Sequence, residues 1–208
     1  MINSSIKNII FDLGGVILNI DYQLASNEFQ NLGIQNFDEL YSQAKQNNLF
    51  DELETGKISP ESFRNEIRKM SGLDISDTDL DNAWNAMLLD LPKERIDLLF
   101  ELSKKYRIFL LSNTNIIHFK NFNYAIINSL GEDVFLKIFE KVYYSFEIGF
   151  RKPNADCFQF VLDDAKLKSH ETLFIDDSIQ HINAAEKLGI QTIHLTNGNT
   201  INKIFINS

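Results

Sequence analysis

Four short apolar segments of the chain each lead into a residue that can take part in chemistry. In chain order these residues are Asp12, the pair Ser112 and Asn113, Lys152, and the pair Asp176 and Asp177. Uninterrupted apolar runs are typical of strands that are covered on both faces of a parallel sheet. Because parallel strands end at a common edge, where α/β proteins bind their ligands, we expect these side chains to share one site.

The predicted site would combine carboxylates, a hydroxyl, an amide and an ammonium group. Clustered carboxylates raise one another's pKa unless a cation lies among them. Oxygen ligands favour Mg²⁺ over zinc, and the single cysteine, Cys157, excludes a cysteine-based zinc cluster. Lys152 and Ser112 supply a positive charge and a hydrogen-bond donor for phosphate oxygens. With Asp12 as a carboxylate nucleophile, the set fits phosphoryl transfer.

The elements that would position these residues alternate between helix and strand after Pro92. The expected strands lie at about 9–11, 108–111, 142–144, 172–175 and 191–195, with helical patterns between them, for example near 125–130. Strands separated by helices indicate βαβ units. The predicted fold class is therefore α/β, with a doubly wound, Rossmann-like parallel sheet.

Residues 20–92 differ from the rest, because they contain helical patterns and no convincing strand. Phe63, Ile67 and Met70 would line one face of a helix capped by Ser59. Further helices are expected at about 24–32, 37–44 and 80–88. We interpret residues 1–19 and 93–208 as one α/β domain, and residues 20–92 as a helical domain inserted after its first strand.

The composition is that of an ordinary globular protein with an acidic balance. Of 208 residues 44% are hydrophobic, and the net charge of −9 argues against a nucleic-acid or anionic membrane surface. No apolar stretch approaches the length of a membrane span, and the N-terminus has no signal-peptide pattern. We expect a cytoplasmic protein that acts on a small molecule, without nucleic acid or membrane; monomer and homodimer are both open.

At four places the sequence resembles the haloacid dehalogenase superfamily, and the resemblance covers nearly the whole chain. The segments that carry it are Phe11-Asp12-Leu13-Gly14-Gly15-Val16, Leu111-Ser112-Asn113, Arg151-Lys152-Pro153 and Phe174-Ile175-Asp176-Asp177-Ser178. Each segment alone is a weak signal, whereas four in this order at strand ends are a specific one. The helical insert resembles the C1-type cap that closes over the site and selects the substrate.

The resemblance implies a role for each of these residues. Asp12 would be the nucleophile that becomes an aspartyl-phosphate. The implied catalytic and phosphate-binding residues are Asp12, Ser112, Asn113 and Lys152, and the implied Mg²⁺ ligands are Asp12, the carbonyl of Gly14, Asp176 and Asp177. His181, where many members place another acid or amide, is interpreted as helix surface.

Gly14 departs from the usual pattern, which commonly places a second Asp at this position as general acid and base. A glycine cannot protonate a leaving group. Asp21 is a candidate substitute, with capping of a helix as the alternative role for its side chain. The pattern around Asp12 is most similar to a bacterial subgroup of α-glucose-1-phosphate phosphatase-like proteins.

These observations predict a Mg²⁺-dependent phosphatase that hydrolyses a small phosphorylated metabolite, such as a sugar 1-phosphate, through an aspartyl-phosphate. One alternative is a 2-haloacid dehalogenase-type hydrolase, which uses the same Asp, Ser-Asn and Lys positions without a metal. Asp176 and Asp177 argue against it, because a metal-free site gains nothing from them. The other alternative is a binding or regulatory protein whose catalysis is weak because Gly14 has replaced the acid.

Overall fold

A five-stranded parallel sheet forms the centre of the protein, of which the computed structural model describes residues 3–35, 37, 48–131, 133–196 and 198–206. The strand order is β3-β2-β1-β4-β5. The strands are β1 (Asn8–Phe11), β2 (Arg107–Ser112), β3 (Lys141–Tyr144), β4 (Thr172–Asp176) and β5 (Gln191–His194). The predicted α/β class with a doubly wound parallel sheet is confirmed.

The register of the central strands brings the predicted site residues to one edge. Phe11 at the end of β1 is level with Leu110 of β2 and Ile175 of β4. Asp12 continues this alignment, because its backbone N–H donates to Ile175 O at 3.0 Å. The carboxyl ends of these three strands, with Asp12, Ser112 and Asp176, therefore lie at the same edge of the sheet.

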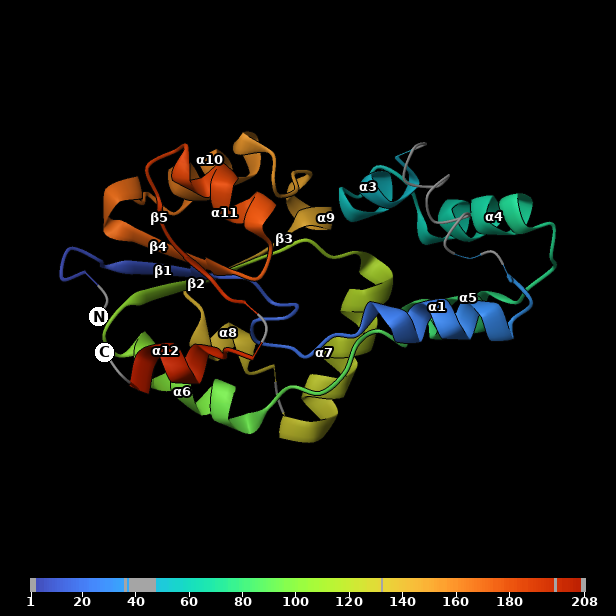
Figure 1. Cartoon of the computed structure of the whole chain (residues 1–208), viewed down its shortest axis with the longest axis horizontal. Helices are drawn as coiled ribbons and strands as arrows, with labels where there is room; N and C mark the ends of the chain where they lie inside the picture. Colours follow the sequence, from blue (N-terminus) through green and yellow to red (C-terminus); the bar gives the residue numbers. More distant parts are fainter. Residues whose placement is uncertain (1–2, 36, 38–47, 132, 197, 207–208) are drawn as a thin grey trace.

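Helices cover both faces of the sheet (Figure 1). The helices α10 (Ala155–Asp164) and α11 (Ile179–Glu186) lie on one face, and α6 (Lys93–Ser103), α8 (Phe135–Ile138) and α12 (Ile201–Ile206) lie on the other. Successive side chains of β1 alternate between these layers. Ile9 and Phe11 pack on the α6 side, whereas Ile10 packs on the α10 side.

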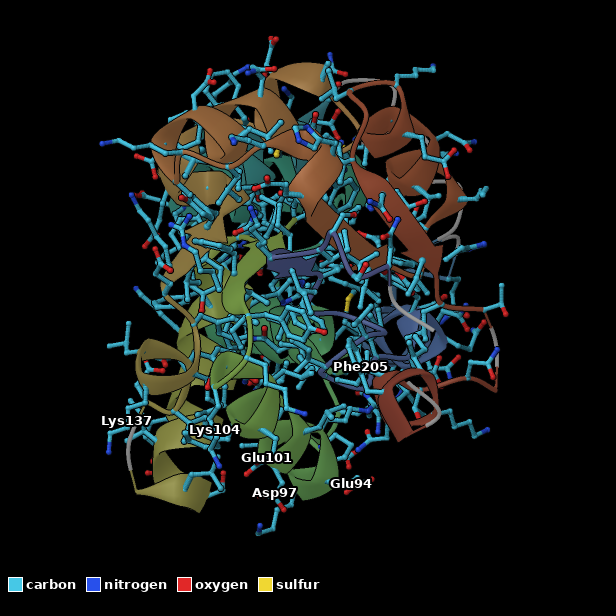
Figure 2. The ribbon with its side chains drawn as sticks, turned by 90° about the vertical axis from the view of Figure 1, so that its left-hand side faces the viewer. Glu94, Asp97, Glu101, Lys104, Lys137 and Phe205 are labelled. Carbon is cyan, nitrogen blue, oxygen red and sulfur yellow. The ribbon has the colours of Figure 1, made fainter. Side chains whose placement is uncertain are left out.

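The outward face of α6 is charged. Figure 2 shows Glu94, Asp97 and Glu101 projecting away from the ribbon. Lys104 Nζ lies 2.5 Å from Glu101 Oε1, and both side chains are mostly exposed. Exposed pairs of this kind contribute little to stability, so we interpret this face as solvated surface over a buried inner face.

Four helices lie beside the sheet rather than on it (Figure 1). They are α1 (Tyr22–Asn31), α3 (Leu49–Glu54), α4 (Pro60–Ser71) and α5 (Asp77–Asn85). Their buried side chains form a hydrophobic cluster around Phe29, Phe63 and Trp84, which also receives Ile117 from α7 (Ile116–Leu130). The predicted helix at 37–44 lies outside the described residues, apart from Phe37.

Two neighbouring linkers join these helices to the sheet. Asn19 N donates to Asp90 O at 3.0 Å, and Leu89 N donates to Asn19 O at 3.0 Å. The paired linkers and the separate hydrophobic cluster support the division into residues 1–19 with 93–208 and residues 20–92, which stays an interpretation. Among the described residues, no helix combines the length and the apolar character that a membrane crossing requires.

The remaining short elements connect the sheet to its helices. They are α9 (Ser145–Ile148) after β3 and the 3₁₀ helix η1 (Ser169–Glu171) before β4. The helix α7 begins earlier than the sequence pattern near 125–130 indicates. Asn115 caps it, because the side-chain oxygen accepts from Ile117 N at 3.0 Å and from His118 N at 3.1 Å.

Candidate active site

The carboxyl edge of the sheet opens into a cavity of about 410 Å³ that faces the inserted helices. The side chains that line it from the α/β part include Asp12, Ser112, Asn113, His118, Arg151, Asp177 and His181. Those that line it from the inserted segment are Ile20, Tyr22, Phe50, Glu54, Trp84, Met87 and Leu88. The residues predicted at the ends of separate strands therefore meet in one place.

Lys152 is fully buried, and its ammonium group lies between two carboxylates. Nζ is 2.8 Å from Asp12 Oδ1 and 2.6 Å from Asp176 Oδ2. Burial opposes the positive charge, but the two carboxylates outweigh burial and raise the pKa of Lys152. The lysine is therefore a fixed cation within the carboxylate cluster.

Asn113 holds the backbone of this lysine. The side-chain oxygen of Asn113 accepts from Lys152 N at 2.9 Å, and its amide nitrogen donates to Lys152 O at 2.8 Å. Both ends of the Asn113 amide are thus engaged in positioning Lys152. The predicted contact between Asn113 and a substrate stays a prediction.

Asp176 uses both carboxylate oxygens within the protein. Oδ2 faces Lys152, whereas Oδ1 accepts from Ser178 N at 2.8 Å and lies 2.9 Å from His181 Nδ1. Burial opposes ionisation of Asp176, but Lys152 and His181 outweigh it and hold the pKa of this carboxyl below its usual range. The interpretation of His181 as helix surface is wrong, because its side chain is largely buried against Asp176.

Asp12, Asp176 and Asp177 can each offer one oxygen within 4.8 Å of the others. Burial raises the pKa of Asp12 to about 7, and Asp176 and Asp177 add to this shift against the opposing charge of Lys152. Burial and the charge of Asp176 also raise the pKa of Asp177. A divalent cation among these oxygens would offset the repulsion, and hard oxygen ligands are the kind that Mg²⁺ prefers. The donor set therefore fits Mg²⁺.

Ser112 is buried, yet it lines the cavity. Its hydroxyl makes no side-chain hydrogen bond to the residues that the structure describes. The loop that follows is fixed instead by Ser145, whose Oγ accepts from Thr114 N at 3.0 Å and donates to Thr114 O at 2.8 Å. The Ser112 hydroxyl thus remains available to a ligand on a rigid loop.

The two glycines after Asp12 have different constraints. Gly15 has a positive φ of 74°, and a Cβ there would lie 2.2 Å from Asp177 Oδ2. Only glycine fits this turn without displacing that carboxylate. A Cβ on Gly14 would meet Ile20 Cδ1 at 3.3 Å, so a Cβ at position 14 needs only a small adjustment of Ile20.

Asp21 caps α1, because its side chain accepts from Gln23 N at 2.9 Å. The side chain is exposed and is not among those that line the cavity. The geometry therefore corresponds to the capping alternative for Asp21 and not to a substitute acid at the site.

Arg151 joins the loop that carries Lys152 to helix α3. Its Nε lies 2.9 Å from Glu54 Oε2, and it also pairs with Asp51. Burial raises the pKa of Glu54 although Arg151 opposes this effect. Both Glu54 and Arg151 line the cavity, so this ion pair forms part of the wall between the inserted helices and the sheet.

His118 is a further polar residue of the cavity wall. Its Nδ1 lies 2.8 Å from Asn85 Oδ1, and its ring stacks on Trp84 with centroids 5.0 Å apart. Burial lowers the pKa of His118 to about 3, so the imidazole is neutral at pH 7. His118 therefore carries no charge into the cavity.

The sequence interpretation missed His118, Glu54 and Arg151 as residues of the site. A signal existed for His118, because an Asn N-cap at position 115 places residue 118 in the first turn of a helix that starts at the sheet edge. No spacing rule brings Glu54 to Arg151, since they meet only through the packing of α3 against the sheet domain.

The family model that matches the chain is described as haloacid dehalogenase-like hydrolase, and it covers residues 6–189. A D-ribitol-5-phosphate phosphatase of Bacteroides thetaiotaomicron is 33% identical over 193 residues, which are 93% of either chain. The sesquiterpene phosphatase astK of Aspergillus oryzae is 25% identical over 199 residues, covering 93% of this chain and 91% of that protein.

Solved structures with the same fold carry the ligands that the acidic cluster would suit. The structure of HAD family enzyme bt-2542 of Bacteroides thetaiotaomicron in complex with magnesium and inorganic phosphate has a TM-score of 0.85. It is 37% identical, over 96% of this chain and 99% of that one. An L-2-haloacid dehalogenase of Xanthobacter autotrophicus, with a TM-score of 0.61, is only 17% identical over 91% of this chain and 77% of that one, so it shares the fold alone.

Proposed function

The chain belongs to the haloacid dehalogenase-like hydrolase family, and from that premise we propose that it is a Mg²⁺-dependent phosphatase of a small phosphorylated metabolite. The observation that carries the proposal is the arrangement of Asp12, Asp176 and Asp177, whose oxygens lie within 4.8 Å of one another. The phosphatase names of two relatives and the magnesium and phosphate in a solved neighbour support it.

Asp12 is the proposed nucleophile. Its carboxylate oxygen forms a bond to phosphorus while the bond from phosphorus to the ester oxygen breaks, and the leaving oxygen takes up a proton from solvent. Water then attacks phosphorus, the bond from phosphorus to the Asp12 oxygen breaks, and inorganic phosphate leaves with the protons of that water, which restores the carboxylate. Lys152 lies against Asp12, and Ser112 lines the cavity, so we propose that both stabilise charge on the phosphoryl oxygens.

Mg²⁺ would be held by Asp12, Asp176 and Asp177, with the carbonyl of Gly14 as a further proposed ligand. When bound, the ion neutralises negative charge on the phosphoryl group. Asp176 and Asp177 also weigh against a metal-free dehalogenase. Asp177 in particular makes no ion pair with any residue that the structure describes, and burial without a cation raises its pKa.

Two observations favour different phosphate esters. The relative named D-ribitol-5-phosphate phosphatase supports a polyol 5-phosphate, in which the leaving group is a primary alcohol. The absence of an acid at Gly14, with Asp21 occupied as a helix cap, supports a sugar 1-phosphate, whose leaving oxygen needs less help from an acid. Both are small polyhydroxylated phosphate esters, and we propose that class as the substrate.

The test is phosphate release by the purified protein from ribitol 5-phosphate, glucose 1-phosphate, glucose 6-phosphate and p-nitrophenyl phosphate. Each ester is assayed after chelation and again after addition of Mg²⁺, and halide release from L-2-chloropropionate is measured in parallel. Mg²⁺-dependent phosphate release supports the proposal. Halide release without metal would support the dehalogenase, and no turnover of any compound would support a binding or regulatory role.

A further inference from the structure

His118 belongs to the α/β part of the protein, but its side chain contacts the inserted helices. Asn115 fixes the first turn of α7 by capping His118 N and Ile117 N. Trp84 and Asn85, both from α5, hold the imidazole ring by stacking and by a 2.8 Å hydrogen bond. The residue is only 7% exposed, and it lines the cavity.

The contact with Asn85 determines which ring nitrogen carries the proton. The carboxamide oxygen of Asn85 can only accept a hydrogen bond, so Nδ1 of His118 is the donor. Because burial keeps the ring neutral, the single proton resides on Nδ1 and Nε2 keeps its lone pair. The second nitrogen is thus a fixed, uncharged acceptor.

Nε2 has no hydrogen-bond partner among the residues that the structure describes. Nε2 is also not sealed from solvent, so a ligand in the cavity can reach it. By contrast, Nε1 of Trp84, in the ring on which His118 stacks, is sealed from solvent and has no hydrogen-bond partner among the described residues. The cavity therefore presents at His118 an acceptor that no described residue satisfies, whereas the donor of Trp84 is covered by protein atoms.

We propose that His118 is a specificity-determining residue, whose Nε2 accepts a hydrogen bond from a hydroxyl of the substrate's leaving group. The inference rests on the proposed phosphatase function and adds the group that recognises the polyhydroxylated part of the ester. A neutral acceptor suits a hydroxyl, which donates one hydrogen bond and can accept another. When an ester without hydroxyls binds, Nε2 loses contact with water and gains no hydrogen bond. The free-energy cost of that unpaired group weakens binding of the ester, and this is how a site rejects an analogue that lacks a hydroxyl.

The experiment compares esters with and without hydroxyls. Ribitol 5-phosphate is paired with pentyl phosphate, which lacks only the hydroxyls. Glucose 1-phosphate is paired with cyclohexyl phosphate, which lacks the hydroxyls, the ring oxygen and the exocyclic carbon, so the ribitol pair is the decisive one. The variant His118→Phe removes the acceptor but keeps a flat ring on Trp84, and His118→Gln restores an acceptor oxygen. His170→Phe is the matched control, because His170 is exposed on η1 outside the cavity wall.

We expect His118→Phe to lower kcat/KM for the preferred hydroxylated ester by about 10- to 100-fold while its deoxygenated partner changes by less than about threefold. His118→Gln should recover part of the loss, and His170→Phe should change neither ester. Equal losses of kcat/KM on both members of a pair would show that His118 only supports the cavity wall, and unchanged kcat/KM for both members would show that it does not touch the leaving group. Either result overturns the inference while leaving the phosphatase proposal intact.

Failure of the proposed function would be recognised separately. In that case the wild-type protein releases no phosphate from any of the four esters with Mg²⁺ present, and the inference falls with it. Far-ultraviolet circular dichroism and thermal melts of each variant show whether a loss reflects unfolding. A His118→Phe variant that melts like the wild type and still loses preference for the hydroxylated ester would establish the recognition role.

Discussion

Lys152 Nζ lies 2.6 Å from Asp176 Oδ2, and neither side chain is exposed to solvent. The adjacent Asp177 makes no ion pair within the described part of the chain and lies on the cavity wall. The sequence suggests Asp176 and Asp177 as equivalent metal ligands, but their side chains therefore have different roles in the structure. Asp176 compensates a buried lysine, whereas Asp177 balances no charge among the described residues.

Single substitutions should separate these duties. Asp177→Asn should leave the metal-free protein as stable as the wild type, or more stable, because it removes repulsion from Asp176. Asp176→Asn should lower the stability of the metal-free protein by about 3–5 kcal/mol, because breaking a buried pair leaves Lys152 poorly compensated. Thermal melts with chelator measure both effects.

Addition of Mg²⁺ completes this test. The wild-type Tm should rise with Mg²⁺, and the rise should be largely lost in Asp177→Asn, because ligand binding stabilises only a folded state that retains its ligands. An equal rise in wild type and Asp177→Asn would exclude Asp177 as a ligand. Asp163→Asn, on an exposed part of α10, serves as the charge-matched control.

The nucleophile is tested by Asp12→Asn. A neutral amide does not attack phosphorus, so turnover of every phosphate ester should fall to background. Because the substitution also leaves Lys152 paired with Asp176, the protein should remain folded, which circular dichroism checks. Activity within about tenfold of the wild type would contradict the role of Asp12.

The sequence was sufficient to predict the parallel sheet and the meeting of Asp12, Ser112 and Asp177. The reason is local: uninterrupted apolar runs define buried strands, and parallel topology brings their carboxyl ends to one edge. Asp12 is hydrogen-bonded through its backbone to Ile175 of the adjacent strand, as that reasoning requires.

The rest of the site depends on contacts that no local pattern encodes. Glu54 and Arg151 meet across two parts of the chain, and His181 turns back from α11 to contact Asp176. Clustered acids indicated that a cation lies among them, and in the packed structure the Lys152 ammonium group, 2.8 Å from Asp12 Oδ1, supplies part of that positive charge. Pairing of this kind is a property of the packed structure and is absent from the spacing of residues.

The buried, neutral His118 should make stability depend on pH. Its pKa is about 3 in the folded protein against 6.5 when unfolded, so the unfolded chain binds more protons between these values. The stability that this residue contributes is complete above pH 6.5 and is lost as the pH falls. Between pH 7 and pH 5 the wild type should lose about 2 kcal/mol more than His118→Gln, measured by urea unfolding. Parallel pH profiles for the two proteins would show that His118 ionises normally.

Substitution of Gly14 tests how much catalytic rate the protein loses by lacking a general acid at this position. Gly14→Asp should be tolerated, because a Cβ there meets only the side chain of Ile20, with Cδ1 at 3.3 Å and Cγ2 at 3.7 Å. General acid catalysis contributes about 10²- to 10⁴-fold, and its benefit is largest for leaving groups that must be protonated as the bond breaks. Gly14→Asp should therefore raise kcat/KM for ribitol 5-phosphate and glucose 6-phosphate more than for p-nitrophenyl phosphate, whose leaving group departs unaided.

Gly14→Asn is the control, because it supplies the same shape without an acidic proton and should raise kcat/KM for none of these esters. If Gly14→Asn matches Gly14→Asp, the gain comes from packing against Ile20; if wild type already hydrolyses all three esters at equal rates, another group in the cavity donates the proton.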